Sequence, residues 1–194
     1  MLVGLLGQAQ SGKDSVADYL ETNHLFVKAS FAGELKRVCA ELFDLTYDQL
    51  NTTEGKATID PRYDITPRTI LQKVGTDWFR SIYPKVWTDR LFKLIMGKLK
   101  VVITDVRFLN EVVAVKEHGG FVIRLIREDY QALQGKEAQH ASEMEQLTVP
   151  EDLIDLTVSA KTGELEKLYK EVTDFLGSLE LRTRALYSRN TGME

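Results

Sequence analysis

Short apolar runs alternate with segments of helical periodicity along most of the chain. Met1–Leu6, Lys100–Thr104 and Phe121–Ile126 are apolar runs typical of buried parallel strands. Leu25–Ser30 and Leu153–Ser159 are further strand candidates. The spacing of apolar residues predicts helices between these strands, over Gly12–Glu21, Phe31–Phe43, Pro67–Ile82, Trp87–Leu99, Phe108–His118 and Gly163–Leu179. This alternation predicts an α/β domain built on a parallel sheet.

Two polar stretches interrupt the pattern. Asp44–Thr66 contains Pro61 and shows little periodicity, and Glu128–Pro150 is charged and rich in glutamine. Long stretches without regular structure in a compact domain are usually functional covers or mobile segments. We therefore expect a single domain over residues 1–180 that carries both stretches on its surface. Residues 181–194 have mixed charge and are expected to form a loosely held tail.

The first strand candidate leads into the stretch GQAQSGKDS. Gly7, Gly12 and Lys13 have the spacing of a phosphate-binding loop, G-x-x-x-x-G-K-[ST], and a strand before and a helix after are what that motif requires. Consecutive backbone N–H groups and the N-terminus of the helix would then face an anion. Lys13 would reach the β- and γ-phosphates of a nucleotide.

Asp14 occupies the position where the motif has a hydroxyl. One interpretation is that Asp14 holds Mg²⁺, the waters of the metal or the acceptor side of the site, while Ser15 supplies the hydroxyl one residue later. The other is that Asp14 is a first-turn aspartate stabilised by the helix dipole. The residues alone leave both interpretations open.

A second candidate group follows the strand candidate KVVIT. Asp105 lies at the carboxyl end of this strand, the edge where ligands bind in open α/β sheets. Arg107 and Glu111 follow at two and six residues, and both would point into the same crevice if a helix begins near Leu109. The alternative is that Asp105 only caps a helix and Arg107 is solvated.

The segment TPRTILQKVGTDWFR supplies a third group. Its polar and small residues, several of which would share one side of a helix, are Arg68, Gln72, Gly75, Thr76 and Arg80. Charge-assisted bonds from Arg68 and Arg80 would grip a phosphate.

The aromatic residues in and near this segment are expected mainly in the hydrophobic core. Trp78 and Phe79 are expected in the core, and Trp87 belongs either to the core, which is favoured, or to the wall of a base-binding site. Lys36 fits the polar side of a helix as well as it fits a phosphate contact.

The composition of the chain argues against several classes of protein. The net charge of −4 argues against a general nucleic-acid or membrane surface, and no apolar run reaches the 18 residues of a membrane span. Cys39 is the only cysteine, which excludes an intrachain disulfide, and the histidines lack zinc-ligand spacing. The N-terminus has no signal-peptide pattern, so a cytoplasmic protein is expected.

Four motifs together resemble the phage deoxynucleoside monophosphate kinases, members of the P-loop kinase group. They are GQAQSGKDS, LQKVGTDWFR with the later Trp87, TDVRFLNE and HASE, and the resemblance extends from Leu2 to about Leu168. It implies a three-layer P-loop kinase fold with a central five-stranded parallel sheet, helices on both faces and a lid insertion. It also implies transfer of the ATP γ-phosphate to a deoxynucleoside monophosphate (dNMP), with Mg²⁺ as cofactor. Phage origin would place the protein in the host cytoplasm, and because related kinases are often dimers, a homodimer is one expectation.

The resemblance assigns roles by motif. It places the phosphate loop on Gly7, Gln10, Ser11, Gly12, Lys13, Asp14 and Ser15. It places dNMP binding on Lys36, Arg68, Gln72, Gly75, Thr76, Trp87, Asp105, Arg107 and Glu111, with residues 44–99 as the monophosphate-binding insertion. The lid would be residues 127–150, with candidates Arg127, His140, Ser142 and Glu143. Catalysis would rest on Lys13, Asp14, Arg68, Arg107 and Glu111, and Mg²⁺ would be held directly or through water by Asp14, Ser15 and Asp105.

Three rival functions remain at this point. The stretch VSAKTGEL is similar to the SAK element of GTP-dependent switches, but no NKxD precedes it, so we interpret Ser159–Gly163 as a strand-to-helix turn beside the adenine. The second rival is another small-molecule P-loop kinase, of the dephospho-coenzyme A or phosphomevalonate type. The third is a nucleotide-binding protein without catalytic activity.

Overall fold

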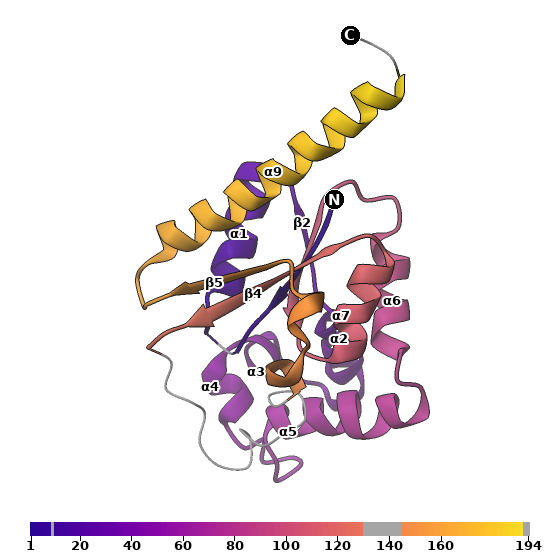
Figure 1. Ribbon diagram of the computed structural model, residues 1–194. Helices are drawn as coiled ribbons and strands as arrows, with labels where there is room; N and C mark the ends of the chain where they lie inside the picture. The colour runs from indigo at the N-terminus through magenta and orange to yellow at the C-terminus, as the bar shows by residue number, and fades with distance from the viewer. Residues whose placement is uncertain (9, 130–144, 192–194) are drawn as a thin grey trace.

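A parallel sheet forms the centre of the molecule. The computed structural model describes residues 1–8, 10–129 and 145–191, with side chains up to residue 182 (Figure 1). The five strands are β1 (Leu2–Leu6), β2 (Val27–Ala29), β3 (Val101–Val106), β4 (Phe121–Arg127) and β5 (Leu156–Ala160). Their order is β2-β3-β1-β4-β5, and each neighbouring pair is parallel. The five-stranded parallel sheet is thus confirmed.

The strand order determines where a ligand can bind. The central strand β1 has β3 on one side and β4 on the other, so the chain winds first toward one edge of the sheet and then toward the other. Ligands of open α/β sheets bind outside the carboxyl ends of the strands, at the point where the winding reverses. The carboxyl end of β1, at Leu6, lies at that point.

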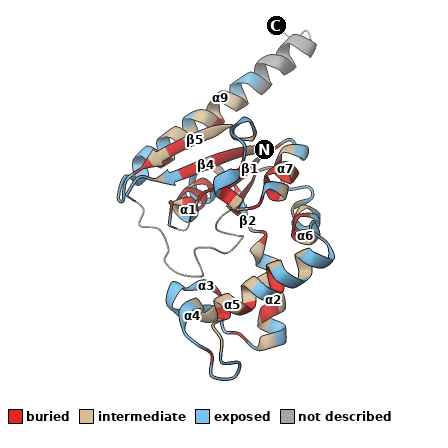
Figure 2. Ribbon diagram, turned by 60° about the horizontal axis from the view of Figure 1, so that its bottom comes forward, coloured by how far each residue is buried: buried red, intermediate tan, exposed pale blue. Residues whose placement is uncertain are grey.

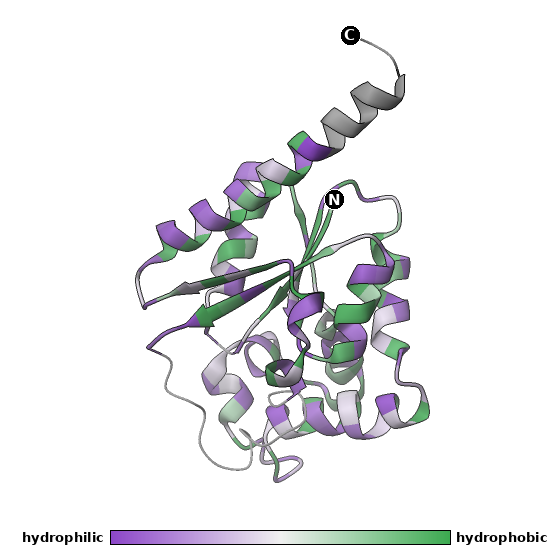
Figure 3. Ribbon diagram, viewed as in Figure 1, coloured by the Kyte–Doolittle hydropathy of each residue, from purple (hydrophilic) through white to green (hydrophobic). Residues whose placement is uncertain are grey.

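Helices cover both faces of the sheet. On one face, α1 (Lys13–His24) and α9 (Leu165–Thr191) bury Val16, Leu20 and Val172 against alternate residues of the strands. On the other face, α6 (Val86–Ile95) and α7 (Leu109–Glu117) bury Leu91 and Val115 against the remaining strand residues. The strands β1 and β3 are therefore largely buried, whereas the edge strand β2 is exposed at Val27 and Lys28. Figures 2 and 3 colour the ribbon by burial and by hydropathy. The predicted three-layer arrangement is confirmed.

Several boundaries differ from the predicted ones. Helix α1 begins at Lys13 because Gly12, with φ 92°, has a left-handed conformation that ends the loop. Helix α9 continues to Thr191 where the pattern predicted an end at Leu179, and it extends past the body of the domain in Figure 1. The chain beyond Leu179 has no proline to stop it. No helix within the described part of the chain has both the length and the apolar character needed to cross a membrane.

The predicted lack of regular structure over Asp44–Thr66 is wrong. After α2 (Ala32–Phe43) come two helices of five residues each, α3 (Tyr47–Asn51) and α4 (Thr53–Ala57). Thr46 begins α3 with a capping box, and the hydroxyl of Thr52 accepts the N–H of Gly55 at 2.9 Å to begin α4. Helices this short are specified by their caps, because one turn carries no visible periodicity.

A turn around Asp60 stabilises residues 44–66, the segment with α3 and α4 that is called the insertion from here on. The Asp60 carboxylate is buried and accepts hydrogen bonds from the backbone N–H of Arg62 at 3.0 Å, from the Arg62 guanidinium and from Gln49 Nε2 at 2.8 Å. Leu45 and Leu50 of the insertion pack against Cys39 of α2 in a small apolar cluster. The insertion is therefore a packed unit.

A helix with an unusual turn follows the insertion. Helix α5 (Pro67–Gln72) runs directly into a π-helix, η1 (Lys73–Arg80), so the predicted helix over this region is confirmed but its π-turns were not expected. The i→i+5 bonds of a π-helix change the direction of every following side chain. The predicted core position of Trp78 is accordingly wrong, because Trp78 is 58% exposed, whereas Phe79 packs partly into the core.

We expect Asp60→Asn to lower the melting temperature at pH 7, because an amide loses the charge-assisted bonds to Arg62. The hydrogen bonds from Arg62 lower the pKa of Asp60, so its contribution to stability is present above the ordinary pKa of about 3.9 and declines as the pH falls below that value. The difference between the two proteins should therefore shrink in thermal unfolding at about pH 3. Asp64→Asn, at an exposed position of the same turn, is the control, and equal melting temperatures at pH 7 for Asp60→Asn and wild type would contradict the expectation.

Candidate functional site

Two glycines shape the loop between β1 and α1. Gly7 has φ 155°, and a Cβ there would lie 2.4 Å from the carbonyl oxygen of Leu125 in β4. A Cβ on Gly12 would lie 2.7 Å from Leu168 Cδ1 in α9. Both positions combine a backbone conformation that side chains rarely adopt with close packing, so the loop requires glycine at each.

Lys13 begins α1 and lies against the loop. Its ammonium donates to the carbonyl oxygens of Gly7 at 2.7 Å and Gln8 at 2.5 Å, and its side chain is only 8% exposed. The positive charge is therefore held at the helix N-terminus, where the dipole also favours an anion. This is the arrangement that the sequence motif predicts.

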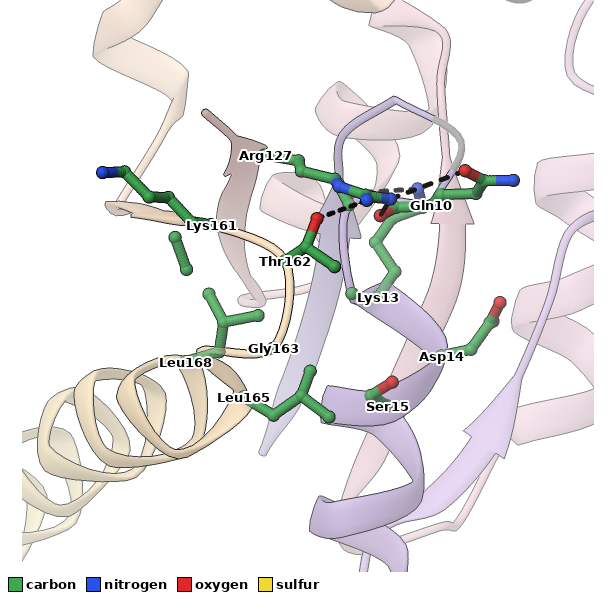
Figure 4. Close-up of a pocket in the computed structure, with 13 residues that line it drawn as sticks. Gln10, Lys13, Asp14, Ser15, Arg127, Lys161, Thr162, Gly163, Leu165 and Leu168 are labelled. Carbon is green, nitrogen blue, oxygen red and sulfur yellow. Dashed lines mark hydrogen bonds between the residues drawn. The ribbon is translucent and has the colours of Figure 1, made fainter. Parts of the chain in front are cut away.

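A pocket of about 260 Å³ opens beside the loop (Figure 4). Gln10, Ser11, Asp14 and Ser15 line one side of it. The opposite side comes from the turn between β5 and α9 and from the first turns of α9, with Lys161, Thr162, Gly163, Leu165 and Leu168. The pocket thus joins the polar, glycine-rich loop to an apolar wall, a combination that suits a nucleotide.

Arg127 spans this pocket from the end of β4. Its guanidinium donates to the hydroxyl of Thr162 and to the backbone and side-chain oxygens of Gln10, both at 3.5 Å (Figure 4). The Arg127 side chain also pairs with Asp129 at 3.2 Å, and hydrogen bonds from Thr162 lower the pKa of Asp129. Arg127 therefore connects the loop at Gln10 with the β5–α9 turn at Thr162, and its role in a lid stays a prediction. His140, Ser142 and Glu143, the other lid candidates, lie outside the described residues.

Asp105 connects β3 with α2. Its carboxylate oxygens accept the backbone N–H groups of Phe31 at 2.8 Å and Ala32 at 2.9 Å. Burial raises the pKa of Asp105, and these hydrogen bonds oppose the rise. Asp105 therefore does fix a helix start, but the helix is α2, whose sequence position gives no hint of the contact.

Glu111 and Arg80 form a buried pair behind Asp105. The guanidinium of Arg80 bonds to Glu111 and, at 3.2 Å, to Asn110, and it lies 3.8 Å above the ring of Phe108. The other oxygen of Glu111 accepts the backbone N–H groups of Arg107 at 2.8 Å and Phe108. Burial raises the pKa of Glu111 to about 7, against the lowering effect of Arg80, and the Asp105 carboxylate adds to the rise. Arg80, proposed from the sequence as a phosphate grip, instead orients Glu111.

Four cations gather at the carboxyl edge of the sheet. Burial lowers the pKa of Lys56, and the charges of Lys36, Arg68 and Arg107 lower it further, while Asp14 raises it. These groups come from α2, α4, α5 and the turn after β3, so segments distant in the sequence contribute cations near Lys56, and the dNMP-binding role of Lys36, Arg68 and Arg107 stays a prediction. Sequence analysis missed Lys56 because it lies in the insertion, and the signal that could have located it was the cap at Thr52.

The remaining candidates of this region support the helices. Trp87 is 6% exposed, and its indole N–H donates to the carbonyl oxygen of Gly75 at 2.9 Å, so it belongs to the core. A Cβ on Gly75 would lie 2.5 Å from Leu35 Cδ2, which explains the glycine. Gln72 and Thr76 are half-buried on α5 and η1.

The described residues offer a limited set of oxygen donors for Mg²⁺. Asp14 and Ser15 line the pocket in the first turn of α1, whereas both oxygens of Asp105 already accept backbone N–H groups. Within the described ranges, no cluster of three or more histidine, cysteine or acidic side chains could hold a metal alone. Such a donor set fits Mg²⁺, which usually binds through one or two protein oxygens together with phosphates and water.

Comparisons with known proteins identify the fold. No family model matches the chain. A protein of Acanthamoeba polyphaga mimivirus, named "Putative deoxynucleotide monophosphate kinase", is 36% identical over 188 residues, covering 89% of this chain and 94% of the relative.

Two solved structures of kinases have a similar fold at lower sequence identity. The shikimate kinase of Aquifex aeolicus vf5 matches with a TM-score of 0.56 at 17% identity, over 93% of this chain and 99% of that chain. The dephospho-CoA kinase of Campylobacter jejuni matches with a TM-score of 0.50 at 11% identity, over 92% and 96%. At these identities the likeness shows the fold alone, which is that of the P-loop kinases.

We expect Arg80→Met to destabilise the protein by about 3–5 kcal/mol, because it leaves the Glu111 carboxylate buried without its cation. Loss of Arg80 also raises the pKa of Glu111 further, and a carboxyl with a raised pKa loses stability as the pH rises through that pKa. Urea unfolding should therefore find the variant weaker relative to wild type at about pH 8 than at about pH 5.

The double variant Arg80→Met, Glu111→Gln is the control for this pair. It removes the buried charge together with its partner, so it should recover part of the lost stability and most of the lost pH dependence. An Arg80→Met protein as stable as wild type at both pH values would contradict the buried pair.

Proposed function

Because the chain belongs to the deoxynucleotide monophosphate kinase family, we propose that it transfers the γ-phosphoryl group of ATP to a deoxynucleoside monophosphate, giving dNDP and ADP. Family membership makes the protein a phosphotransferase of the P-loop kinase type. The identity of the acceptor is the proposed part. It is supported by the name of the mimivirus relative and by the four motifs in the sequence.

One observation carries the proposal, and it concerns Asp14. Asp14 lines the pocket beside the phosphate loop, and its carboxylate is one of the charges near Lys56, whose pKa it raises. The candidate phosphate loop and the group of four cations therefore both lie at the carboxyl edge of the sheet. Phosphoryl transfer needs a donor and an acceptor phosphate in line and close together, and this arrangement supports two neighbouring sites for them.

The donor side would use the loop and its lysine. The backbone N–H groups of the loop and Lys13 would hold the β- and γ-phosphates, and the apolar wall of Leu165 and Leu168 would receive the base. Mg²⁺ bound with ATP would neutralise phosphate charge, with Ser15 and Asp14 as its protein contacts, directly or through water. Arg127 would contribute from the lid.

The acceptor side would use the cations. Lys36, Arg68 and Arg107 would bind the monophosphate, and Asp105 and Glu111 would position α2 and the Arg107 backbone through the contacts described above. Closure of residues 127–150 would exclude water and limit hydrolysis of ATP. The ligands of these sites would be small nucleotides. A homodimer is proposed only because related kinases are often dimers.

A second candidate is another small-molecule kinase of the same fold. The structural matches include a shikimate kinase and a dephospho-CoA kinase, which share the sheet and the loop but act on other acceptors, as their names state. The acceptor is thus the quantity that an experiment must determine. A nucleotide-binding protein without catalysis would bind ATP but transfer nothing.

We expect ADP release from ATP to depend on at least one of dAMP, dGMP, dCMP and dTMP in a coupled assay with Mg²⁺. The four ribonucleoside monophosphates, shikimate and dephospho-CoA should be tested as acceptors in the same assay. Lys13→Met should lower kcat by about 10²–10³, because it removes a preorganised charge at the transferred phosphate. Lys98→Met, an exposed lysine at the opposite edge of the sheet, should leave kcat unchanged. Activity on shikimate or dephospho-CoA, with none on any dNMP, would replace the proposed function.

A further inference from the structure

Lys56 is a half-buried lysine in the insertion, a part of the chain that the motifs do not reach. It lies on the last turn of α4, and α4 packs against α5, which carries Arg68. In Figure 1, α3, α4 and α5 lie together below the sheet, on the side of its carboxyl edge. The insertion therefore brings its own cation to the edge where ligands bind.

The backbone around Lys56 is firmly held. Thr52 caps α4, and a Cβ on Gly55 would lie 2.2 Å from the carbonyl oxygen of Asp48, so α3 and α4 are closely packed on each other. Asn51, at the end of α3, accepts the ammonium of Lys36 at 2.9 Å. The α3–α4 junction thus holds the backbone that carries Lys56 and one hydrogen-bond partner of Lys36.

The charges around Lys56 are mostly of its own sign. The charged groups that most affect its pKa are the cations Lys36, Arg68 and Arg107 and the carboxylate of Asp14. Within the described ranges, no carboxylate forms an ion pair with Lys56. Like charges that are held together and partly buried repel one another, and a bound anion relieves that repulsion.

We propose that Lys56 binds the phosphate of the acceptor, in addition to Lys36, Arg68 and Arg107. The inference rests on the proposed function, since it assigns a further residue to the same site. A phosphate monoester carries up to two negative charges and three oxygens that accept hydrogen bonds, which suits a group of cations arriving from several elements. The acceptor phosphate would then be bound both by Lys56 of α4 and by Lys36 of α2, which donates a hydrogen bond to Asn51.

Protonation of Lys56 should be coupled to acceptor binding. Burial and the three neighbouring cations lower the pKa of Lys56 in the protein without ligand. A phosphate beside the ammonium raises that pKa again, so the charged lysine binds the acceptor more tightly than the neutral one. An arginine at this position would stay charged at any pH that the protein tolerates.

The test compares Lys56→Met, Lys56→Arg and the control Lys98→Met by steady-state kinetics with ATP and each of the four dNMPs. Lys56→Met should raise KM for the dNMP about 10- to 100-fold, the range expected for one charged hydrogen bond, and should leave KM for ATP within about twofold. Lys56→Arg should retain most of the affinity. A role in folding alone would instead change both KM values or lower the yield of folded protein.

The pH profile gives an independent measurement. In the wild type, kcat/KM for the dNMP should fall on the alkaline side at a pH below the ordinary lysine pKa of about 10.4, and Lys56→Arg should move that fall to higher pH. The inference is overturned if Lys56→Met has the same dNMP KM as Lys98→Met, or if the alkaline fall is the same in Lys56→Arg as in the wild type.

Failure of the proposed function would look different. A wild-type protein that phosphorylates no dNMP would refute that function, and calorimetric titration with inorganic phosphate would then test Lys56 alone. Weaker phosphate binding by Lys56→Met than by Lys98→Met would support the anion site, and equal binding would overturn it.

Discussion

The buried carboxylates of Asp105 and Glu111 hold the acceptor side of the molecule in place. Asp105 accepts two backbone N–H groups at the start of α2, and Glu111 accepts the backbone N–H groups of Arg107 and Phe108 while it pairs with Arg80 of the π-helix. The element D-x-R-x-x-x-E thus connects β3 with a helix before it and a helix after it. Arg107, which lies between the two acids in the sequence, is one of the cations near Lys56.

This arrangement explains why the buried acids are tolerated. Burial raises the pKa of both carboxyl groups, which means that desolvation disfavours their charged forms. Backbone N–H groups and the Arg80 guanidinium offset that cost, and in return they fix the positions of α2, η1 and the Arg107 backbone. Lys36, on α2, and Arg68, on the helix that runs into η1, therefore belong to elements that these buried carboxylates help to fasten. A site whose cations are positioned in this way needs little rearrangement when an anion binds.

The sequence predicts the framework of this molecule better than the details of its site. The five strands, the phosphate loop and the helices over Phe31–Phe43 and Pro67–Ile82 all follow from periodicity and glycine spacing, because burial on both faces of a sheet demands apolar runs. The helices α3 and α4 were missed because caps at Thr46 and Thr52 specify them, and the exposed Trp78 was missed because a π-turn changes side-chain direction without any sequence signal. The Arg80–Glu111 pair and the position of Lys56 join segments that are distant in the chain, so only the fold brings them together.

The two sequence-based interpretations of Asp14 are compatible once the fold is known. Its place in the first turn of α1 is one where the helix dipole favours a carboxylate. The same carboxylate is exposed, lines the pocket beside Lys13 and acts on Lys56 across the crevice. A hydroxyl at this position could serve a metal, but it carries no negative charge that would stabilise nearby cations. In the proposed function, the carboxylate therefore suits a loop that must stand next to a cationic acceptor site, a demand that a nucleotide-hydrolysing switch, whose acceptor is water, does not have.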